Sequence, residues 1–69
     1  MAEVLWDAWD VAEGLDVSIH QARRALHRWR KAELLSPAGT DSITKALRYR
    51  PEDVRAAQKS EQTQRAATA

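Results

Sequence analysis

The 69-residue sequence contains no cysteine and no phenylalanine, and it has only two glycines and two prolines. Without cysteine the chain can form no disulfide, no thiolate metal site and no thiol nucleophile. No apolar run approaches the roughly 20 residues that a membrane-spanning helix needs, and the acidic amino-terminal stretch is unlike a signal peptide. We therefore expect a soluble intracellular protein.

Few glycines and prolines together with 43% hydrophobic residues are typical of a folded helical protein. A chain of this length forms one small domain, which buries only about 60% of the surface that its unfolded chain would expose. The last ten residues, SEQTQRAATA, are polar and aperiodic. We expect a domain over residues 1–59 and a disordered tail over residues 60–69.

No acidic residue lies between Asp16 and Glu33, although the chain has ten acids and eleven Lys and Arg residues. The interval carries five of these bases and both histidines, whereas residues 1–16 carry five acids and no base. At about 100° per residue, its apolar residues form one stripe and its basic residues gather on the opposite face. The stripe consists of Ile19, Ala22, Ala25, Leu26, Trp29 and Ala32. The pattern predicts an amphipathic helix from about Ile19 to Ala32 or Glu33, with Ser18 as its N-cap.

A shorter helix is expected upstream, because Asp7 can cap it and Asp10 occupies the reciprocal position of a capping box. Trp6 is placed to pack onto Val11 as a hydrophobic staple. The link between the two helices carries Asp16 where glycine is commoner, and aspartate tolerates the left-handed conformation better than most residues. Two short helices joined by a tight turn, the second basic on its exposed face, indicate a helix-turn-helix.

The remaining segments predict a hairpin and a third helix. Residues 46–50 alternate apolar and basic side chains like a half-buried strand, and we expect them to pair with Leu34 and Leu35. The tip of this hairpin would project as a wing. Pro51 would open a helix that runs through about Lys59. The expected fold class is mainly α with a small β-hairpin wing, a winged helix-turn-helix.

The succession ELLSPAG…LRYRPEDVRAA, within residues 33–57, resembles the end of the DNA-binding domain of MerR-type regulators and the related small excisionases. The similarity extends over residues 5–57. Regulators of the MerR type continue into a long dimerisation helix and an effector domain, whereas this sequence stops. It is therefore more similar to stand-alone excisionases or small regulators of the same superfamily. This resemblance implies a cytoplasmic, nucleoid-associated protein of a bacterium or phage.

A helix in the major groove meets base edges that differ in their donors and acceptors. Gln21 can address adenine and Arg24 guanine, whereas Arg28 and Lys31 are placed further along for phosphates. The expected DNA-binding residues are Ser18, His20, Gln21, Arg23, Arg24, His27, Arg28 and Lys31 on the helix, and Thr40, Lys45 and Arg48 on the wing. The wing residues would contact the flanking backbone or the minor groove.

Other chemistry finds less support in the sequence. His20 and His27 lie about 10 Å apart along the helix axis, too far for one metal ion. The chain has no nucleophile elbow and no phosphate loop, so we expect neither an enzyme nor a cofactor. Trp6, Trp9 and Trp29 are expected in the core, with Trp9 off the main stripe. The charged helix face could also be merely solvated.

Three functional interpretations stay open. The first is an excisionase that organises attachment-site DNA and steers an integrase, its partner, towards excision. The second is a small transcription regulator that uses the same surface. The third is a module whose basic helix binds an acidic protein; insertion of that helix into a membrane would require apolar residues that the core needs. A further hypothesis is that the acids Asp7, Asp10 and Glu13 meet another copy of the protein on tandem DNA sites.

Overall fold

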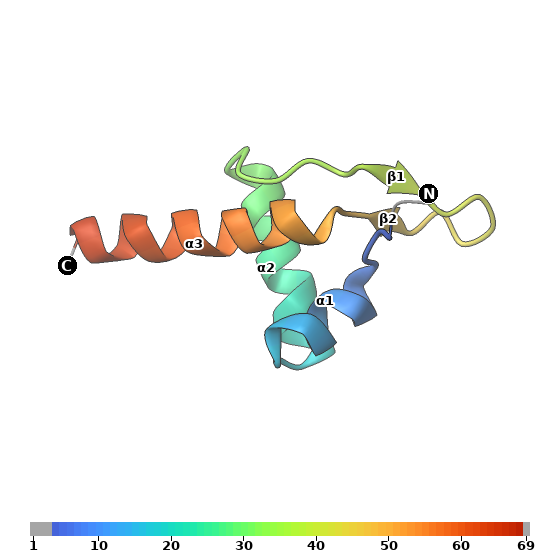
Figure 1. Cartoon of the computed structure of the whole chain (residues 1–69), viewed down its shortest axis with the longest axis horizontal. Helices are drawn as coiled ribbons and strands as arrows, with labels where there is room; N and C mark the ends of the chain where they lie inside the picture. Colours follow the sequence, from blue (N-terminus) through green and yellow to red (C-terminus); the bar gives the residue numbers. More distant parts are fainter. Residues whose placement is uncertain (1–3, 69) are drawn as a thin grey trace.

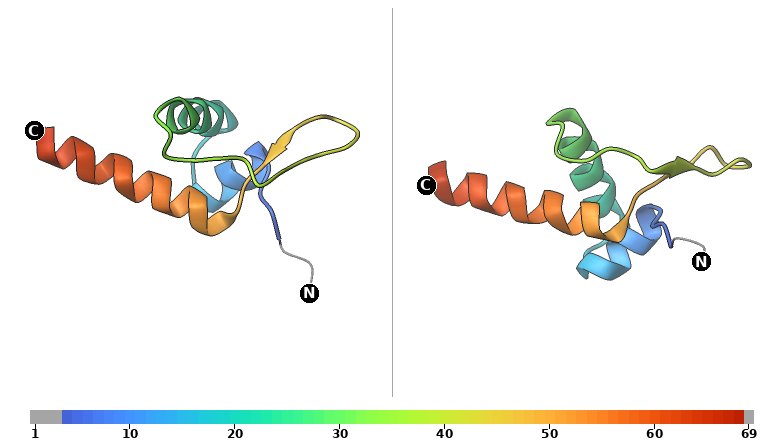
Figure 2. Two further views of the ribbon diagram at one scale, coloured as in Figure 1. Left: turned by 90° about the horizontal axis from the view of Figure 1, so that it is seen from above. Right: turned by 45° about the horizontal axis from the view of Figure 1, so that its top comes forward.

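The computed structural model describes residues 4–68, which form three helices and a two-stranded antiparallel hairpin (Figure 1). The elements are α1 (Ala8–Leu15), α2 (Ile19–Lys31), β1 (Gly39–Thr40), β2 (Leu47–Arg48) and α3 (Pro51–Thr68). α2 crosses the first turns of α3, and α1 packs beside α2. The hairpin and the far end of α3 extend from opposite sides of α2 (Figure 2). Within residues 4–68, none of the helices combines the length and the apolarity that crossing a membrane requires.

One hydrophobic core forms where the three helices meet. Its buried residues are Val11, Ala12, Ala22, Leu26, Trp29, Leu35, Tyr49, Val54 and Ala57. The apolar stripe predicted for α2 is confirmed for five of its six residues, since Ala22, Leu26 and Trp29 are buried and Ile19 and Ala25 are partly buried. Ala32 is exposed, because α2 ends at Lys31 and the chain turns away there. Burying such side chains contributes about 1.5–3 kcal/mol for each large one, which is the main stabilisation available to so small a domain.

Both helices of the amino-terminal half begin with a capping box. Asp7 Oδ1 accepts from the Asp10 amide at 2.9 Å, and Asp10 Oδ2 accepts from the Asp7 amide at 3.2 Å, as the sequence predicts. Ser18 is the N-cap of α2, and its hydroxyl accepts from the amide of Gln21 at 3.1 Å. The Gln21 side chain returns the bond, accepting from the Ser18 amide at 3.0 Å. Each box satisfies amides that the first turn of a helix otherwise leaves without partners.

Both of these helices end on a residue in the left-handed conformation. Asp16 has φ 56° after α1, as the sequence predicts, and Glu33 has φ 62° after α2. After α2 the amide of Leu34 donates to the Trp29 carbonyl at 2.8 Å and that of Glu33 donates to the Arg30 carbonyl at 3.1 Å. These are the two bonds of a Schellman motif. The helices are therefore closed at both ends, which fixes the short turn between them.

Trp6 ties the segment before α1 to the segment after the hairpin. Its amide donates to the Tyr49 carbonyl at 2.7 Å, and its carbonyl accepts from the Tyr49 amide at 2.8 Å. The indole ring lies against Gly14, where a β-carbon would be 2.5 Å from Trp6 Cη2. The glycine is therefore required for close packing rather than for a left-handed backbone.

The predicted pairing of Leu34 and Leu35 with residues 46–50 is wrong. β1 is formed instead by Gly39 and Thr40, which pair with Arg48 and Leu47 respectively. Leu35 lies outside any strand and is buried in the core, and Leu34 packs against that core. Two adjacent leucines can serve the core from a loop because the chain after α2 passes over it. The observed strand is shorter than the expected residues 46–50, since only Leu47–Arg48 form β2.

α3 does not end near Lys59 but continues to Thr68, so residues 60–68 of the expected tail belong to this helix, and Ala69 lies outside the described residues. Glu61 lies one turn beyond the buried Ala57 and accepts from Trp29 Nε1 at 3.0 Å and from Arg28 Nη2 at 2.8 Å. This polar contact extends the docked face of α3 beyond its last buried apolar residue. Apolar periodicity does not indicate this part of the helix, because the anchoring side chain is a carboxylate.

Candidate nucleic-acid interface

The face of α2 opposite its buried stripe carries His20, Arg24, His27 and Lys31, and all four side chains are exposed. Their spacing places them in one row that extends about 16 Å along the helix. We call these four residues the outer row. Because the other face of α2 is held by the core, the outer row is presented by a fixed element.

The flank of α2 that faces α3 carries Gln21 and Arg28. The Arg28 guanidinium forms two hydrogen bonds with the Glu61 carboxylate, through Nε and Nη2. This pairing raises the pKa of Arg28, and the same hydrogen bond, with that of Trp29, lowers the pKa of Glu61 below its usual value. Arg28 therefore has an intramolecular partner, whereas the sequence suggested a side chain available for a phosphate.

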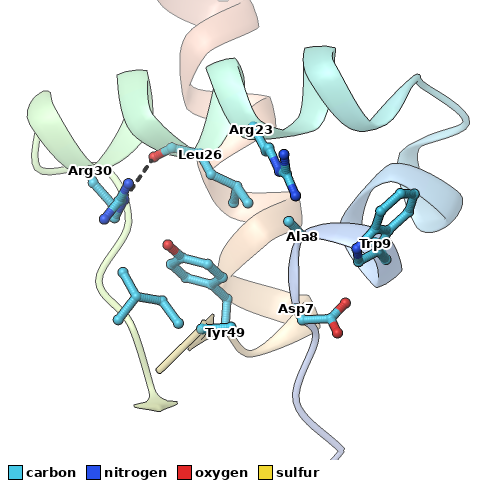
Figure 3. A pocket seen from close by; sticks show the side chains of 9 residues that line it. Asp7, Ala8, Trp9, Arg23, Leu26, Arg30 and Tyr49 are labelled. Atoms are coloured by element: carbon cyan, nitrogen blue, oxygen red, sulfur yellow. Dashed lines mark hydrogen bonds between the residues drawn. The ribbon is translucent and has the colours of Figure 1, made fainter. Parts of the chain in front are cut away.

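The opposite flank of α2 carries Arg23 and Arg30 and borders a hollow of about 400 Å³ between α1, α2 and the hairpin (Figure 3). The lining residues are Asp7, Ala8, Trp9, Arg23, Leu26, Arg30, Ala46, Leu47 and Tyr49. The Tyr49 hydroxyl points into this hollow. Arg23 Cζ lies 6.0 Å from the centre of the Trp9 ring, within the range of a cation–π contact. The hollow thus combines an apolar floor with two guanidinium groups.

Asp41 organises the hairpin tip. Its Oδ1 accepts from the amides of Ile43 and Thr44 at 2.8 and 2.9 Å, and its Oδ2 accepts from Arg48 Nη2 at 2.9 Å. These bonds, those of the two amides first, lower the pKa of Asp41 to about 2. Lys45 closes the turn with φ 63°. The tip is therefore a defined turn.

The structure distributes the expected DNA-binding residues over the outer row, the start of α2, the hairpin and the two flanks of α2. His20, Arg24, His27 and Lys31 form the outer row, and Ser18 and Gln21 form the capping box before it. Thr40, Lys45 and Arg48 belong to the hairpin, where Arg48 is paired with Asp41. Arg23 and Arg28 lie on opposite flanks of α2 and face the hollow and α3, respectively.

Two residues that border the hollow were not predicted as site residues, and the location of one tryptophan was predicted wrongly. Arg30 and Tyr49 border the hollow but were not among the expected site residues. Arg30 could have been found from its position seven residues after Arg23, which places both on one flank. Trp9 was expected in the core, but it is 62% exposed and lines the rim of the hollow.

Comparison with known proteins yields no relative. No protein-family model matches the chain, and searches of curated proteins and of solved structures likewise find no match. Among the residues that the structure describes, no three His, Asp or Glu side chains are grouped so that they could hold a metal ion. Function must therefore be inferred from the surface itself.

Proposed function

We propose that this protein binds duplex DNA as a winged helix-turn-helix of the MerR-like kind, with α2 in the major groove and the hairpin as the wing. The observation that carries the proposal is the outer row, four exposed polar and basic side chains on a helix whose opposite face is buried. A helix fixed in this way can enter the groove without losing side chains from its own core.

Arg24 is the best candidate for reading a base, because a guanidinium can contact both acceptors of a guanine edge. Gln21 is less suited than the sequence suggested. Its Oε1 already accepts from the Ser18 amide, so a bidentate contact with adenine would have to share this oxygen with the capping box and fit the orientation that the box imposes. Lys31 lies at the far end of the outer row, where a phosphate contact is more natural. Specificity would therefore depend on Arg24 and the two histidines of the row.

The test compares Arg24→Ala and Lys31→Ala on a duplex selected from a random library and on random duplexes, by fluorescence anisotropy at fixed salt. We expect Arg24→Ala to weaken only the selected site, by about 1–3 kcal/mol. Lys31→Ala should weaken all sequences alike. Lys59→Ala, on the exposed side of α3, is the control of matched charge. Failure of the unmodified protein to bind any duplex at low salt would overturn the proposal.

Excisionases and small regulators would use this surface in the same way, and we propose the excisionase role, with an integrase as partner, as the first of the two. A recombination assay separates them. An excisionase should stimulate excision between attachment sites by its integrase, and a variant lacking Arg24 should not. A protein that binds beside a promoter and leaves recombination unchanged would instead be a regulator.

The acidic surface of α1 supports the proposal that copies associate on tandem sites. Glu13 is exposed and, unlike Asp7 and Asp10, does not belong to the capping box. Glu13→Lys should therefore reduce cooperative filling of tandem sites without affecting the helix start. Independent filling of adjacent sites by the unmodified protein would contradict this proposal.

A further inference from the structure

The hollow between α2 and the hairpin contains basic groups that the outer row does not use. Arg23 and Arg30 are seven residues apart, or about 10 Å along the helix axis, and both border this hollow (Figure 3). Its floor is apolar where Leu26 and Leu47 line it. Hydrogen bonds and ion pairs are stronger beside such a floor than in open water.

Neither arginine is neutralised by a carboxylate within the part of the chain that the structure describes. This distinguishes them from Arg28 and Arg48, which pair with Glu61 and Asp41. Arg23 is steadied by the Trp9 ring, while Arg30 Nε makes a long contact of 3.4 Å with the Leu26 carbonyl. Both guanidinium groups therefore retain donors for a ligand.

One carboxylate, that of Asp7, also lines the hollow. Its Oδ1 accepts from the Asp10 amide, and it caps the positive end of the α1 dipole. Its charge is thus offset in part by the helix that it caps. With two guanidinium groups against one carboxylate, the lining carries a net positive charge.

Tyr49 adds a neutral donor to the two arginines. Its ring is buried with 2% of its surface exposed, and the backbone bonds with Trp6 hold it in place. Burial raises the pKa of the phenol, and Arg30 opposes this with a smaller effect. The hydroxyl is therefore protonated at neutral pH and points into the hollow as a hydrogen-bond donor.

We propose that this hollow binds a phosphate of the DNA backbone, which accepts hydrogen bonds from Arg23, Arg30 and the Tyr49 hydroxyl. The inference rests on the proposed function. A duplex that contacts both the outer row and the hairpin must pass one strand over the surface between these two elements, and the hollow is lined by residues of both α2 and the hairpin. Phosphate is the DNA group that guanidinium and hydroxyl donors recognise without regard to sequence.

The experiment measures the affinity for selected and random duplexes over a range of salt concentrations, using Arg30→Gln, Tyr49→Phe and the control Lys59→Gln. Each phosphate contact by a cation contributes about 0.9 to the slope of log K against log salt. Arg30→Gln removes one of the two cations at this phosphate, so it should lower the magnitude of the slope on both duplexes, by at most about 0.9. Tyr49→Phe removes only a neutral donor, so it should weaken binding roughly tenfold and leave the slope unchanged. Lys59→Gln should change neither quantity.

A parallel titration of the unmodified protein with inorganic phosphate, followed by NMR, distinguishes DNA from a free anion. Saturable shifts at Arg30 and Tyr49, without any effect of their substitution on DNA binding, would assign the hollow to a free phosphate compound and overturn the proposal. If the unmodified protein binds duplexes and both variants match it, the hollow is not at the backbone while the proposed function stands. If no duplex binds at all, both proposals fail. Thermal unfolding of each variant verifies that the fold is retained.

Discussion

Replacing Gly14 by alanine should destabilise the protein, although the same change in an exposed helix contributes about 1 kcal/mol of stability. The new methyl would lie 2.5 Å from Trp6 Cη2 and 2.8 Å from Cζ3. Carbon atoms in contact prefer about 3.5–4.0 Å, so the indole would have to retreat by about 1 Å. Overpacking of this kind costs about 1–3 kcal/mol, occasionally more.

Trp6 has little freedom to retreat. Its backbone exchanges two hydrogen bonds with Tyr49, and Arg55 Cζ stands 5.7 Å from the centre of its ring. We therefore place the cost at the upper end of the range and expect a net loss of about 1–2 kcal/mol. In a domain of this size each kcal/mol lowers Tm by roughly 4–8 °C. Urea and thermal unfolding followed by circular dichroism measure the change.

The control is the same substitution in a Trp6→Leu background, where the shorter side chain leaves room for the methyl. There Gly14→Ala should stabilise the protein, because only the helix propensity of alanine remains. A reversal of sign between the two backgrounds is the expected result. Stabilisation by Gly14→Ala in the unmodified chain would refute the close packing of Trp6 on this glycine.

Glu61→Gln should cost about 1 kcal/mol by removing the charged partner of Arg28, and Glu52→Gln on an exposed part of α3 should cost less. Because folding lowers the pKa of Glu61, its ionised carboxylate contributes fully to the free energy of unfolding above the ordinary pKa of 4.5, and this contribution is lost as the pH falls through the folded-state pKa. In urea titrations at different pH values, the Glu61→Gln variant should lack this part of the loss of stability in acid. The Asp41 carboxyl should titrate near pH 2 by NMR, and a midpoint near 4 would mean that the hairpin tip is open in solution. Trp9→Ala should change the free energy of unfolding by less than about 0.5 kcal/mol, whereas Trp29→Ala should cost at least about 3 kcal/mol; equal losses would contradict their different burial.

The helices could be predicted from the sequence because their signals are local. Asp7, Ser18 and the apolar stripe of α2 each act within a few residues along the chain, and all three are confirmed. The left-handed residue at Asp16 was expected for the same reason. The order of a hairpin and then a helix after α2 also follows from short patterns.

The remaining features depend on contacts between distant residues. Leu34 and Leu35 resemble a strand in sequence, but they lie in a loop and pack in or against the core. The first strand of the hairpin is formed instead by Gly39 and Thr40. The Glu61 carboxylate anchors the later part of α3, because Arg28 and Trp29 on α2 donate hydrogen bonds to it. The same contact removes Arg28 from the set of unpaired basic groups. Within the candidate site, the outer row was predictable from one helix, whereas the hollow requires three elements to be placed together.

The turns of this protein have a consequence for how it folds. Neither of its two glycines has a positive φ, and the left-handed positions within residues 4–68 are occupied by Asp16, Glu33 and Lys45. An L-residue resists that conformation by roughly 1–2 kcal/mol, so these turns have no local preference strong enough to form them in an isolated peptide. They become favourable only when the elements that they join are packed together. The domain should therefore fold as one cooperative unit, and a fragment containing α2 alone should not keep its ends in place.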